Sequence, residues 1–212
     1  MSKLFDFDKE YGVVVGTDEA GRGPAAGGVF AAAVYFPEVS DGLIEDLARL
    51  NDSKKLSEVA REKLFGIILE VCVNSVINIE VEEIEKINIL NASLKAMKLA
   101  CENVIKEAGL NEFITLVDGN KLIRNYSFPQ KFIIKGDGQS ASIAAASILA
   151  KVSRDRYMKE LAKEFPQYGW NRNAGYLTAE HLKAIDEYGL SKYHRPSFLR
   201  KHFEKQKQLS LF

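Results

Sequence analysis

The chain has 212 residues, 46% of them hydrophobic and 27% charged, and its 29 Lys plus Arg balance 29 Asp plus Glu. This composition excludes a disordered or fibrous protein and allows one compact domain with a small appendage. No apolar run approaches the roughly 20 residues of a transmembrane helix, and residues 1–12 lack a secretory signal, so we expect a cytoplasmic protein without membrane contact. Cys72 and Cys101 lack the spacing of a zinc site, so we expect buried, reduced thiols.

Apolar runs and turn residues predict the elements of the first half of the chain. In chain order we expect a buried strand at 11–17, a glycine-rich turn at 21–28, a strand at 29–36, helices at 41–50 and 57–73 around a polar turn at 51–56, and a strand at 76–81. Because a short connection joins the first two strands, we expect them to pair antiparallel.

The clearest amphipathic helix is predicted at 88–108, where apolar residues recur at three- and four-residue steps and Gly109 supplies the C-terminal stop. The other elements expected in the second half are strands at 113–117 and 131–134 and helices at 140–164, 178–188 and 196–206. The helix at 140–164 is small and apolar in its first half and charged in its second, so we expect it to be buried at one end only. Five strands mixed with helices predict an α/β fold with a helical C-terminal appendage.

Charge is distributed unevenly along the chain. Residues 151–212 carry 13 Lys plus Arg against 7 Asp plus Glu, whereas residues 1–150 carry 16 against 22. An acidic body that binds metal, followed by a basic region that meets phosphates, is one way to build a nuclease. Solvated charged faces without a functional role explain the same asymmetry equally well.

Carboxylates follow three predicted strands at the points where those strands end. Asp18 and Glu19 come directly after the first strand, Asp118 comes after the strand at 113–117, and Asp137 comes shortly after the strand at 131–134. Residues beyond the ends of neighbouring parallel strands line a shared crevice. We therefore expect these four carboxylates to lie close together.

Carboxylates held close together repel one another, and hard divalent cations such as Mg²⁺ offset that repulsion by binding oxygen ligands. Two such ions about 4 Å apart assist phosphodiester cleavage, so the pattern indicates metal-assisted phosphoryl chemistry. Taken singly, Asp118 or Asp137 is more often a turn or helix-cap residue. The adjacent pair Asp18 and Glu19, next to a glycine-rich turn, favours the metal site.

The glycine-rich turn has two interpretations. Gly21, Gly23 and Gly27 after a strand partly match a dinucleotide-binding fingerprint, but that fingerprint requires a helix next, and the residues that follow predict a strand. We therefore favour a backbone that approaches a ligand closely, with Arg22 supplying positive charge.

Six sequence blocks resemble the ribonuclease HII family and occur in that family's order across nearly the whole chain. They are GTDEAGRGPAAGGVFAAAV at 16–34, NDSKKLS at 51–57, VDG at 117–119, KGDGQSASIAAASILAKVSRD at 135–155, GYLTAEH at 175–181 and HRPSF at 194–198. The resemblance implies a ribonuclease-H-like fold with a mixed five-stranded sheet flanked by helices. Since a lobe rich in aromatic and basic residues starts near Phe165, we expect the catalytic domain at 1–164, a helical substrate-binding region at 165–207 and a tail at 208–212.

The resemblance also implies a hydrolase of ribonucleotide excision repair, an endonuclease that depends on Mg²⁺ or Mn²⁺. Members of the family cut RNA–DNA hybrids, and duplex DNA at single embedded ribonucleotides, on the 5′ side of the ribonucleotide, and they leave 3′-hydroxyl and 5′-phosphate ends. Carried over position by position, the metal-binding and catalytic carboxylates are Asp18, Glu19, Asp118 and Asp137. These are the four that the strand ends select, with Asp18 as the ligand that bridges two ions.

The same resemblance implies residues that read the substrate. Gly21, Arg22 and Gly23 contact the ribose 2′-hydroxyl largely through their backbone. Tyr176 matches the family tyrosine that stacks on the next nucleotide and contacts the 2′-hydroxyl as well. Outside its sequence block, Tyr176 has a plainer interpretation as an ordinary packed aromatic residue.

Other motif residues have supporting roles in this interpretation. The candidates for phosphate contact are Lys54, Lys55 and Ser140, and a helix N-terminus near Ser140 would favour a phosphate. The residues expected to brace the C-terminal region are His181, Arg195 and Ser197. The chain departs from the family at Gly28, where many members have proline, and at Leu177, where glycine is frequent.

The chain ends on Gln208, Leu209, Ser210, Leu211 and Phe212, which resemble the bacterial sliding-clamp-binding pentapeptide. In that interpretation Leu211 and Phe212 insert into a groove as apolar anchors and Gln208 fixes the register. A tail that folds back on its own core is the alternative. We expect a monomer whose partners are the nucleic-acid duplex and the clamp.

Two other classes of function stay open. One is a nucleic-acid-binding or clamp-tethered protein without catalysis, although all four carboxylates are present. The other is a different enzyme of the ribonuclease-H fold, such as a resolvase or a type 3 relative. The glycine-rich turn together with Tyr176 favours the type 2 enzyme.

Overall fold

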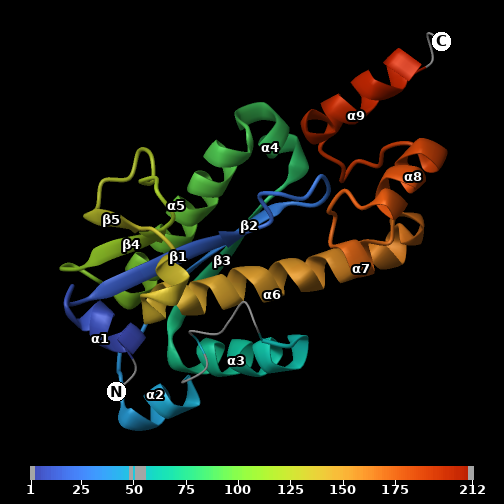
Figure 1. Ribbon diagram of the computed structural model, residues 1–212. Coiled ribbons are helices and arrows are strands. Elements are labelled where there is room, and N and C mark those ends of the chain that lie inside the picture. The colour runs from blue at the N-terminus through green and yellow to red at the C-terminus, as the bar shows by residue number, and fades with distance from the viewer. Residues whose placement is uncertain (1–2, 48–49, 51–55, 210–212) are drawn as a thin grey trace.

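A mixed five-stranded sheet forms the centre of the protein (Figure 1). The computed structural model describes residues 3–47, 50 and 56–209, and the side chains of the last helix up to Glu204. The strands are β1 (Val14–Ala20), β2 (Val29–Tyr35), β3 (Val73–Ile79), β4 (Ile114–Asp118) and β5 (Gln130–Ile133). Their order is β3-β2-β1-β4-β5, with β1 antiparallel to β2 and parallel to β4. The predicted α/β fold, including its antiparallel first pair, is confirmed.

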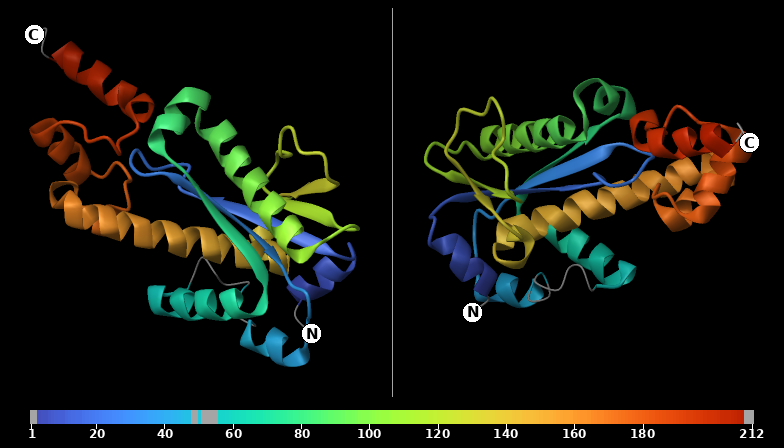
Figure 2. Two further views of the ribbon diagram at one scale, coloured as in Figure 1. Left: turned by 180° about the vertical axis from the view of Figure 1, so that it is seen from behind. Right: turned by 45° about the horizontal axis from the view of Figure 1, so that its top comes forward.

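Helices cover both faces of the sheet. The α-helices in the described part of the chain are α1 (Lys3–Lys9), α2 (Asp41–Asp46), α3 (Glu58–Val71), α4 (Val81–Ile87), α5 (Ile89–Ala108), α6 (Ala141–Glu164), α7 (Trp170–Asn173), α8 (Ala179–Tyr188) and α9 (Pro196–Leu209). Helix α5 packs on one face and α6 on the other, and α3 lies outside α6 (Figures 1 and 2). The helices α7 to α9 gather at the far end of α6 and form the predicted helical C-terminal region.

Strand β1 sends successive side chains to opposite faces of the sheet, as the strand period requires. Val15 packs among residues of α5, whereas Gly16 lies directly beneath α6. A Cβ atom at Gly16 would lie 2.3 Å from the carbonyl carbon of Ser142. Glycine therefore allows α6 to cross β1 at backbone contact distance, and this contact fixes the height of α6 above the sheet.

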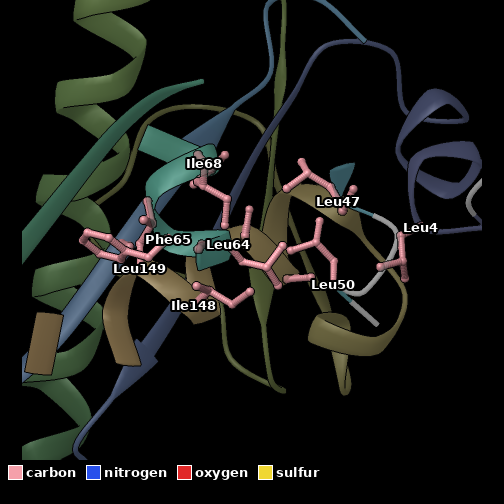
Figure 3. Packing of buried hydrophobic residues seen from close by; sticks show 14 of the residues in the cluster. Leu4, Leu47, Leu50, Leu64, Phe65, Ile68, Ile148 and Leu149 are labelled. Atoms are coloured by element: carbon pink, nitrogen blue, oxygen red, sulfur yellow. The ribbon is translucent and has the colours of Figure 1, made fainter. Parts of the chain in front are cut away.

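Apolar side chains from α1, α3 and α6 form the core on the α6 face of the sheet (Figure 3). The side chains labelled there are Leu4, Leu47, Leu50, Leu64, Phe65, Ile68, Ile148 and Leu149. Each buried side chain of this size contributes about 1.5–3 kcal/mol of transfer free energy. The cluster therefore attaches α1 and α3 to α6, and through α6 to the sheet.

Helix α6 is buried in both halves, so the prediction of a helix buried at one end only is wrong. Its first half packs against the sheet, and its second half buries Met158, Leu161 and Ala162 against the C-terminal region. Apart from the buried Arg154, its charged residues lie on the remaining face, where Arg156 pairs with Glu62 of α3. Apolar residues at helical spacing within a charged background are the signal that composition alone conceals.

Two strands begin and end away from their predicted positions. Strand β1 extends to Ala20 because β2 continues to pair with it as far as the Ala20–Phe30 position. Strand β3 begins at Val73, opposite Tyr35 of β2, and α3 accordingly ends at Val71. Helix α2 ends at Asp46 rather than at residue 50, and the short helices α1, α4 and α7 are absent from the prediction.

The C-terminal region packs on the connection between β1 and β2. Ala25 and Ala26 of that connection are buried among aromatic residues, including Tyr168 and Trp170, whose rings stack with centroids 5.0 Å apart. An isolated antiparallel bridge joins Ala26 to His194. These contacts attach the glycine-rich turn to the C-terminal region.

Every helix in the described part of the chain is too short or too polar to span a lipid bilayer.

Candidate active site

A cleft of about 450 Å³ gathers residues from distant parts of the chain. Its lining residues are Asp18, Glu19, Ala20, Gly21, Arg22, Gly23, Arg61, Asp118, Asp137, Ser147, Ile148, Lys151 and Tyr176. The cleft thus joins the end of β1, the glycine-rich turn, the end of β4, the turn before α6 and the loop before α8. All four predicted carboxylates line it, together with residues 21–23 of the predicted glycine-rich turn and the predicted tyrosine.

Asp18 and Glu19 lie inside β1, which corrects their predicted position after the strand. Strand β4 pairs with β1 only as far as Thr17 opposite Val117, whereas β2 continues past Asp18. The two carboxylates therefore lie beyond the end of the parallel neighbour but within the antiparallel pair. Asp18 is buried, and by the strand period it shares the α6 face with Gly16.

Asp118 ends β4 and holds the turn that carries Asp137. Its position follows the Thr17–Val117 pair, so it lies beside Asp18 on the neighbouring strand. Its Oδ1 accepts a hydrogen bond of 2.6 Å from the backbone nitrogen of Gly136. Asp137, the next residue, is buried in the short 3-10 helix Gly136–Gly138. This bond brings the last predicted carboxylate to the common end of β1 and β4.

Burial and repulsion from neighbouring carboxylates disfavour the charged forms of Asp18 and Glu19. Burial raises the pKa of Asp18 well above its ordinary value, and the neighbouring carboxylates of Glu19 and Asp118 raise it further. Burial also raises the pKa of Glu19, and Arg22, whose Nη1 donates to Glu19 Oε1 at 3.2 Å, partly offsets this. A cation placed among these oxygens would remove the cost of keeping them ionised.

The donor set fits hard divalent cations that keep most of their coordination shell for water and phosphate. Among the described residues, no three His, Cys, Asp or Glu side chains already surround one point closely enough to hold an ion. Mg²⁺ usually takes only one or two carboxylates from the protein and completes its octahedron with waters and substrate phosphates. Four carboxylates in one cleft, two of them with raised pKa values, match that requirement.

Three polar residues that line the cleft are absent from the sequence prediction. Arg61 comes from α3, and Ser147 and Lys151 come from α6, one helical turn apart. A hydrogen bond from the Ser147 side chain lowers the pKa of Asp18, in opposition to the burial that raises it. For Ser147 and Lys151 the sequence offers a signal, because two polar residues spaced four apart in the apolar half of a helix lie on the same face. With Arg22, the two basic residues give the cleft a lining suited to phosphates.

Tyr176 lies beside the glycine-rich turn. A Cβ atom on Gly23 would be 3.3 Å from Cε1 of the Tyr176 ring, so glycine lets the ring approach the turn. Gly21 has a φ of +98°, and a Cβ there would be 2.2 Å from Nε of Arg154. The side chain of Tyr176 is 54% exposed, which argues against the interpretation as an ordinary packed aromatic residue.

The remaining predicted site residues lie outside this cleft or outside the described residues. Ser140 is completely buried, and its Oγ caps α6 by accepting a hydrogen bond from the backbone nitrogen of Ile143. The predicted residues outside the described part of the chain are Lys54, Lys55, Leu211 and Phe212. Gln208 and Leu209 belong to the last turns of α9, where side chains are not described.

Two buried histidines support the loop that carries Tyr176. His181 Nδ1 donates to the carbonyl oxygen of Tyr176 at 2.9 Å, so its Nε2 is the acceptor for the indole N–H of Trp170 at 3.1 Å. His194 Nε2 lies 3.1 Å from the same His181 nitrogen and shares that nitrogen's single lone pair with the indole N–H, and His194 Nδ1 accepts from the backbone nitrogen of Ser191. All of these bonds form together only when both imidazoles are neutral.

Acid is expected to destabilise the C-terminal region through this histidine pair. Burial and the neighbouring His181 lower the pKa of His194 from 6.5 to about 4, so the unfolded chain binds the proton first. Stability is complete above pH 6.5 and is lost as the pH falls toward 4. The thermal midpoint, measured by circular dichroism across this range, should fall by roughly 5 °C or more. The thermal midpoint of a His194→Gln variant should fall by less over the same pH range. An equal fall in both proteins would contradict the assignment of this acid sensitivity to His194.

Comparison with known proteins places these observations in a family. Residues 15–206 match the family model described as Ribonuclease HII. A ribonuclease HII from Fusobacterium nucleatum is 47% identical over 206 residues, which are 97% of this chain and 94% of that protein. The solved PCNA:RNase HII complex from Archaeoglobus fulgidus is similar with a TM-score of 0.70 and 25% identity, covering 86% of this chain and 93% of that one. Ribonuclease H2 from Pyrococcus horikoshii is similar with a TM-score of 0.69 and 25% identity, covering 91% and 98%.

Proposed function

The chain belongs to the ribonuclease HII family and is a ribonuclease H endonuclease, and on that premise we propose that it cuts duplex DNA at single embedded ribonucleotides as well as RNA–DNA hybrids. The observation that carries the proposal is one cleft that combines four carboxylates with a glycine-rich turn and an exposed tyrosine. The carboxylates supply the chemistry, and the turn and the tyrosine supply the recognition of ribose.

The four carboxylates, Asp18, Glu19, Asp118 and Asp137, hold the catalytic metal in this proposal. Divalent ions held there, Mg²⁺ or Mn²⁺, would make a water molecule more nucleophilic and would offset the negative charge that develops on the leaving 3′-oxygen. Asp18 is the residue that would contact both ions, because it is buried and borders both Glu19 and Asp118. Cleavage then falls on the 5′ side of the ribonucleotide and leaves a 3′-hydroxyl and a 5′-phosphate.

Basic residues on the rim orient the scissile phosphate toward the carboxylates. Lys151 and Arg61 line the cleft, and Arg22 is held beside it by its bond to Glu19. Each carries a positive charge that can contact a phosphate oxygen. Lys54 and Lys55, which lie outside the described residues, are further phosphate contacts in this proposal.

Ribose is read by backbone groups of the turn Gly21, Arg22 and Gly23 and by the ring of Tyr176. A 2′-hydroxyl is both a donor and an acceptor of hydrogen bonds, and it is the group that distinguishes RNA from DNA. Glycine at positions 21 and 23 lets the sugar approach the peptide groups closely. Tyr176 then stacks on the nucleotide that follows the ribose.

A defined duplex tests the activity directly. The protein is incubated with Mg²⁺ and a DNA duplex that holds one ribonucleotide, and products are resolved on a denaturing gel. We expect one nick 5′ to the ribonucleotide, no cut in the matched all-DNA duplex, and complete loss of cutting when EDTA removes the metal. Binding without a nick would support a non-catalytic protein, and cutting of longer RNA tracts or junctions alone would support a different enzyme of this fold.

The C-terminal tail binds the DNA sliding clamp in this proposal. The Archaeoglobus fulgidus relative was solved in a complex with PCNA, which supports a clamp partner for this chain. The free Cys72 and Cys101 thiols support a cytoplasmic enzyme, and we take it to act as a monomer.

Removing the two apolar anchors of the tail should weaken clamp binding by at least about tenfold, because a few buried anchors dominate such contacts. The variant is Leu211→Ala with Phe212→Ala, and Ser210→Ala is the matched control from the same tail. Affinity is measured by surface plasmon resonance on immobilised clamp from the same organism. Equal affinity of all three proteins would show that the tail has another role.

A further inference from the structure

Arg154 is a buried arginine that bonds to backbone carbonyls rather than to a carboxylate. It lies in the second half of α6 and is only 2% exposed. Its guanidinium donates to the carbonyl oxygens of Ala26 at 3.0 Å, Gly28 at 3.3 Å and Ala174 at 3.1 Å. The first two belong to the glycine-rich turn at 21–28, and the third lies two residues before Tyr176. One side chain therefore ties both reading elements of the cleft to α6.

Arg195 is a second buried arginine with the same kind of partners. It is completely buried, and its guanidinium donates to the carbonyl oxygens of Gly21 at 2.8 Å, Pro24 at 2.9 Å and Gly27 at 2.6 Å. Its own backbone nitrogen donates to the carbonyl oxygen of Ala25 at 2.7 Å. The turn is thus held from the C-terminal region as well as from α6.

The bond from Arg195 to Gly21 decides which way a peptide group of the turn faces. In a planar trans peptide the C=O and the N–H point in opposite directions. The carbonyl of Gly21 points inward to Arg195, so the N–H of Arg22 in the same peptide points away from Arg195. Gly21, Arg22 and Gly23 line the cleft. Arg195 therefore keeps the carbonyl oxygen of Gly21 away from the cleft and leaves the N–H of Arg22 to donate to a ligand oxygen.

The two elements that the arginines hold are also joined to each other. The backbone nitrogen of Ala25 donates to the carbonyl oxygen of Gly175 at 2.9 Å, and the Tyr176 ring lies over Gly23. The loop is built for this position, since Ala174 has a φ of +48° and Gly175 a φ of +84°. The turn and the loop that carries Tyr176 therefore form one connected unit, and both guanidinium groups hydrogen-bond to the backbone of that unit.

Stability alone is a poor explanation for these two residues. Within the described part of the chain, neither arginine forms an ion pair with an acidic side chain. A guanidinium buried without a carboxylate partner carries a desolvation cost that an apolar side chain of similar volume avoids. What the guanidinium adds is several directed donors in a fixed plane, which suits the shaping of a turn.

We propose that Arg154 and Arg195 are positioning residues for ribose recognition, which orient the amide of Arg22 and lock the Tyr176 loop against Gly23 so that both read the 2′-hydroxyl as one unit. The inference rests on the proposed function. Neither arginine touches the substrate, and each acts through the backbone that it holds.

Binding selectivity tests the inference, because a role in stability alone would not change it. Kd is measured by fluorescence anisotropy for a duplex with one ribonucleotide and for the matched all-DNA duplex, in Asp18→Asn protein so that nothing is cut. Arg154→Lys and Arg195→Lys keep the charge but lose the planar set of donors. Arg156→Lys, two residues along α6 in an exposed pair with Glu62, is the matched control.

We expect each buried lysine variant to reduce the preference for the ribonucleotide duplex by about tenfold, the effect of one lost well-aligned hydrogen bond. Affinity for the all-DNA duplex should change by less than about twofold, since its phosphate contacts remain. The Arg156→Lys protein should keep the full preference. In a Tyr176→Ala background, Arg154→Lys should reduce the preference for the ribonucleotide duplex by less than it does alone, because both changes remove the same contact.

A second variant reaches the same contact from the other side. An added Cβ at Gly21 falls 2.2 Å from Arg154 Nε, and the φ of +98° there disfavours alanine, so Gly21→Ala disturbs the contact between the turn and the guanidinium and should lower the preference similarly. Equal loss of affinity for both duplexes in all three variants, or an unchanged preference, would overturn the inference. If the Asp18→Asn parent itself lacks a preference and the wild type fails to nick, the proposed function is wrong, which is a distinguishable result.

Discussion

Replacing Asp18 by asparagine is expected to abolish cleavage while the protein continues to bind its duplex. Asp18 is the buried centre of the carboxylate group, beside Glu19 and Asp118. Asparagine keeps the shape of the side chain but removes the charge that two cations would share. We expect the nicking rate to fall by at least about a thousandfold, the scale of losing the main electrostatic contribution to a transition state. Single-turnover assays with saturating enzyme measure this rate without interference from product release.

The same substitution should not lower stability, and this separates a site residue from a structural one. Burial and two neighbouring carboxylates raise the pKa of Asp18, so a neutral side chain removes repulsion from the folded state. The thermal midpoint should therefore stay the same or rise. Asp6→Asn, at an exposed position of α1, is the matched control and should leave the rate unchanged. Retained cleavage by Asp18→Asn would overturn the assignment of the site.

Replacing Gly16 by alanine should cause a large loss of stability, although it adds only one methyl group. The added Cβ would lie 2.3 Å from the carbonyl carbon of Ser142 and 2.4 Å from the backbone nitrogen of Ile143. These are backbone atoms of α6, so no side chain can rotate to relieve the contact, and helix and strand must separate. We expect the free energy of unfolding to fall by about 3 kcal/mol or more, at the upper end of overpacking effects.

Gly66→Ala is the control for this substitution. Gly66 lies in α3 with open space around its Cβ position, so alanine there should add up to about 1 kcal/mol through helix propensity. Urea denaturation of the two variants under the same conditions gives both values. Because α6 also carries Ser147 and Lys151 into the cleft, Gly16→Ala should slow cleavage even where the protein remains folded. A Gly16→Ala protein as stable as the wild type would contradict the close crossing of α6 over β1.

Elements with local signals could be predicted from the sequence almost to the residue. Helix α5 is bounded by Asn88, whose side chain accepts from the backbone nitrogen of Asn91, and by Gly109 in the left-handed conformation. Helix α6 begins after Ser140, which caps it through Ile143. In both cases the residues that stop and start the helix are contiguous with it, so no distant contact is needed to place them.

Elements whose limits depend on distant contacts could not be predicted so well. Strand β1 continues to Ala20 because β2 pairs with it that far, and β3 begins at Val73 for the same reason. Helix α1 is short, and its place depends on Leu4 and Phe5 packing in the core below α6. The periodicity of apolar residues along the chain does not show which distant strand or core residues will pack against these elements.

The carboxylates of the site were predictable because strand order alone brings them together. Asp118 lies at the end of β4 beside Asp18 on β1, which follows from the parallel pairing of these strands. The contributions of Arg61, Lys151 and the two buried arginines depend on how α3, α6 and the C-terminal region pack, and the sequence pattern does not specify that packing. Tyr176 needed the family resemblance, because its exposure at the cleft is visible only in the folded chain.

The positions of manganese ions in a crystal of the protein provide the sharpest test of the carboxylate site. Crystals grown with Mn²⁺ and an uncut ribonucleotide duplex are measured at the manganese absorption edge, where anomalous difference maps show each ion directly. We predict two peaks about 4 Å apart, both within coordination distance of Asp18 and reached by Glu19, Asp118 or Asp137. Manganese bound only elsewhere, with the four carboxylates free of any peak, would contradict the two-metal site.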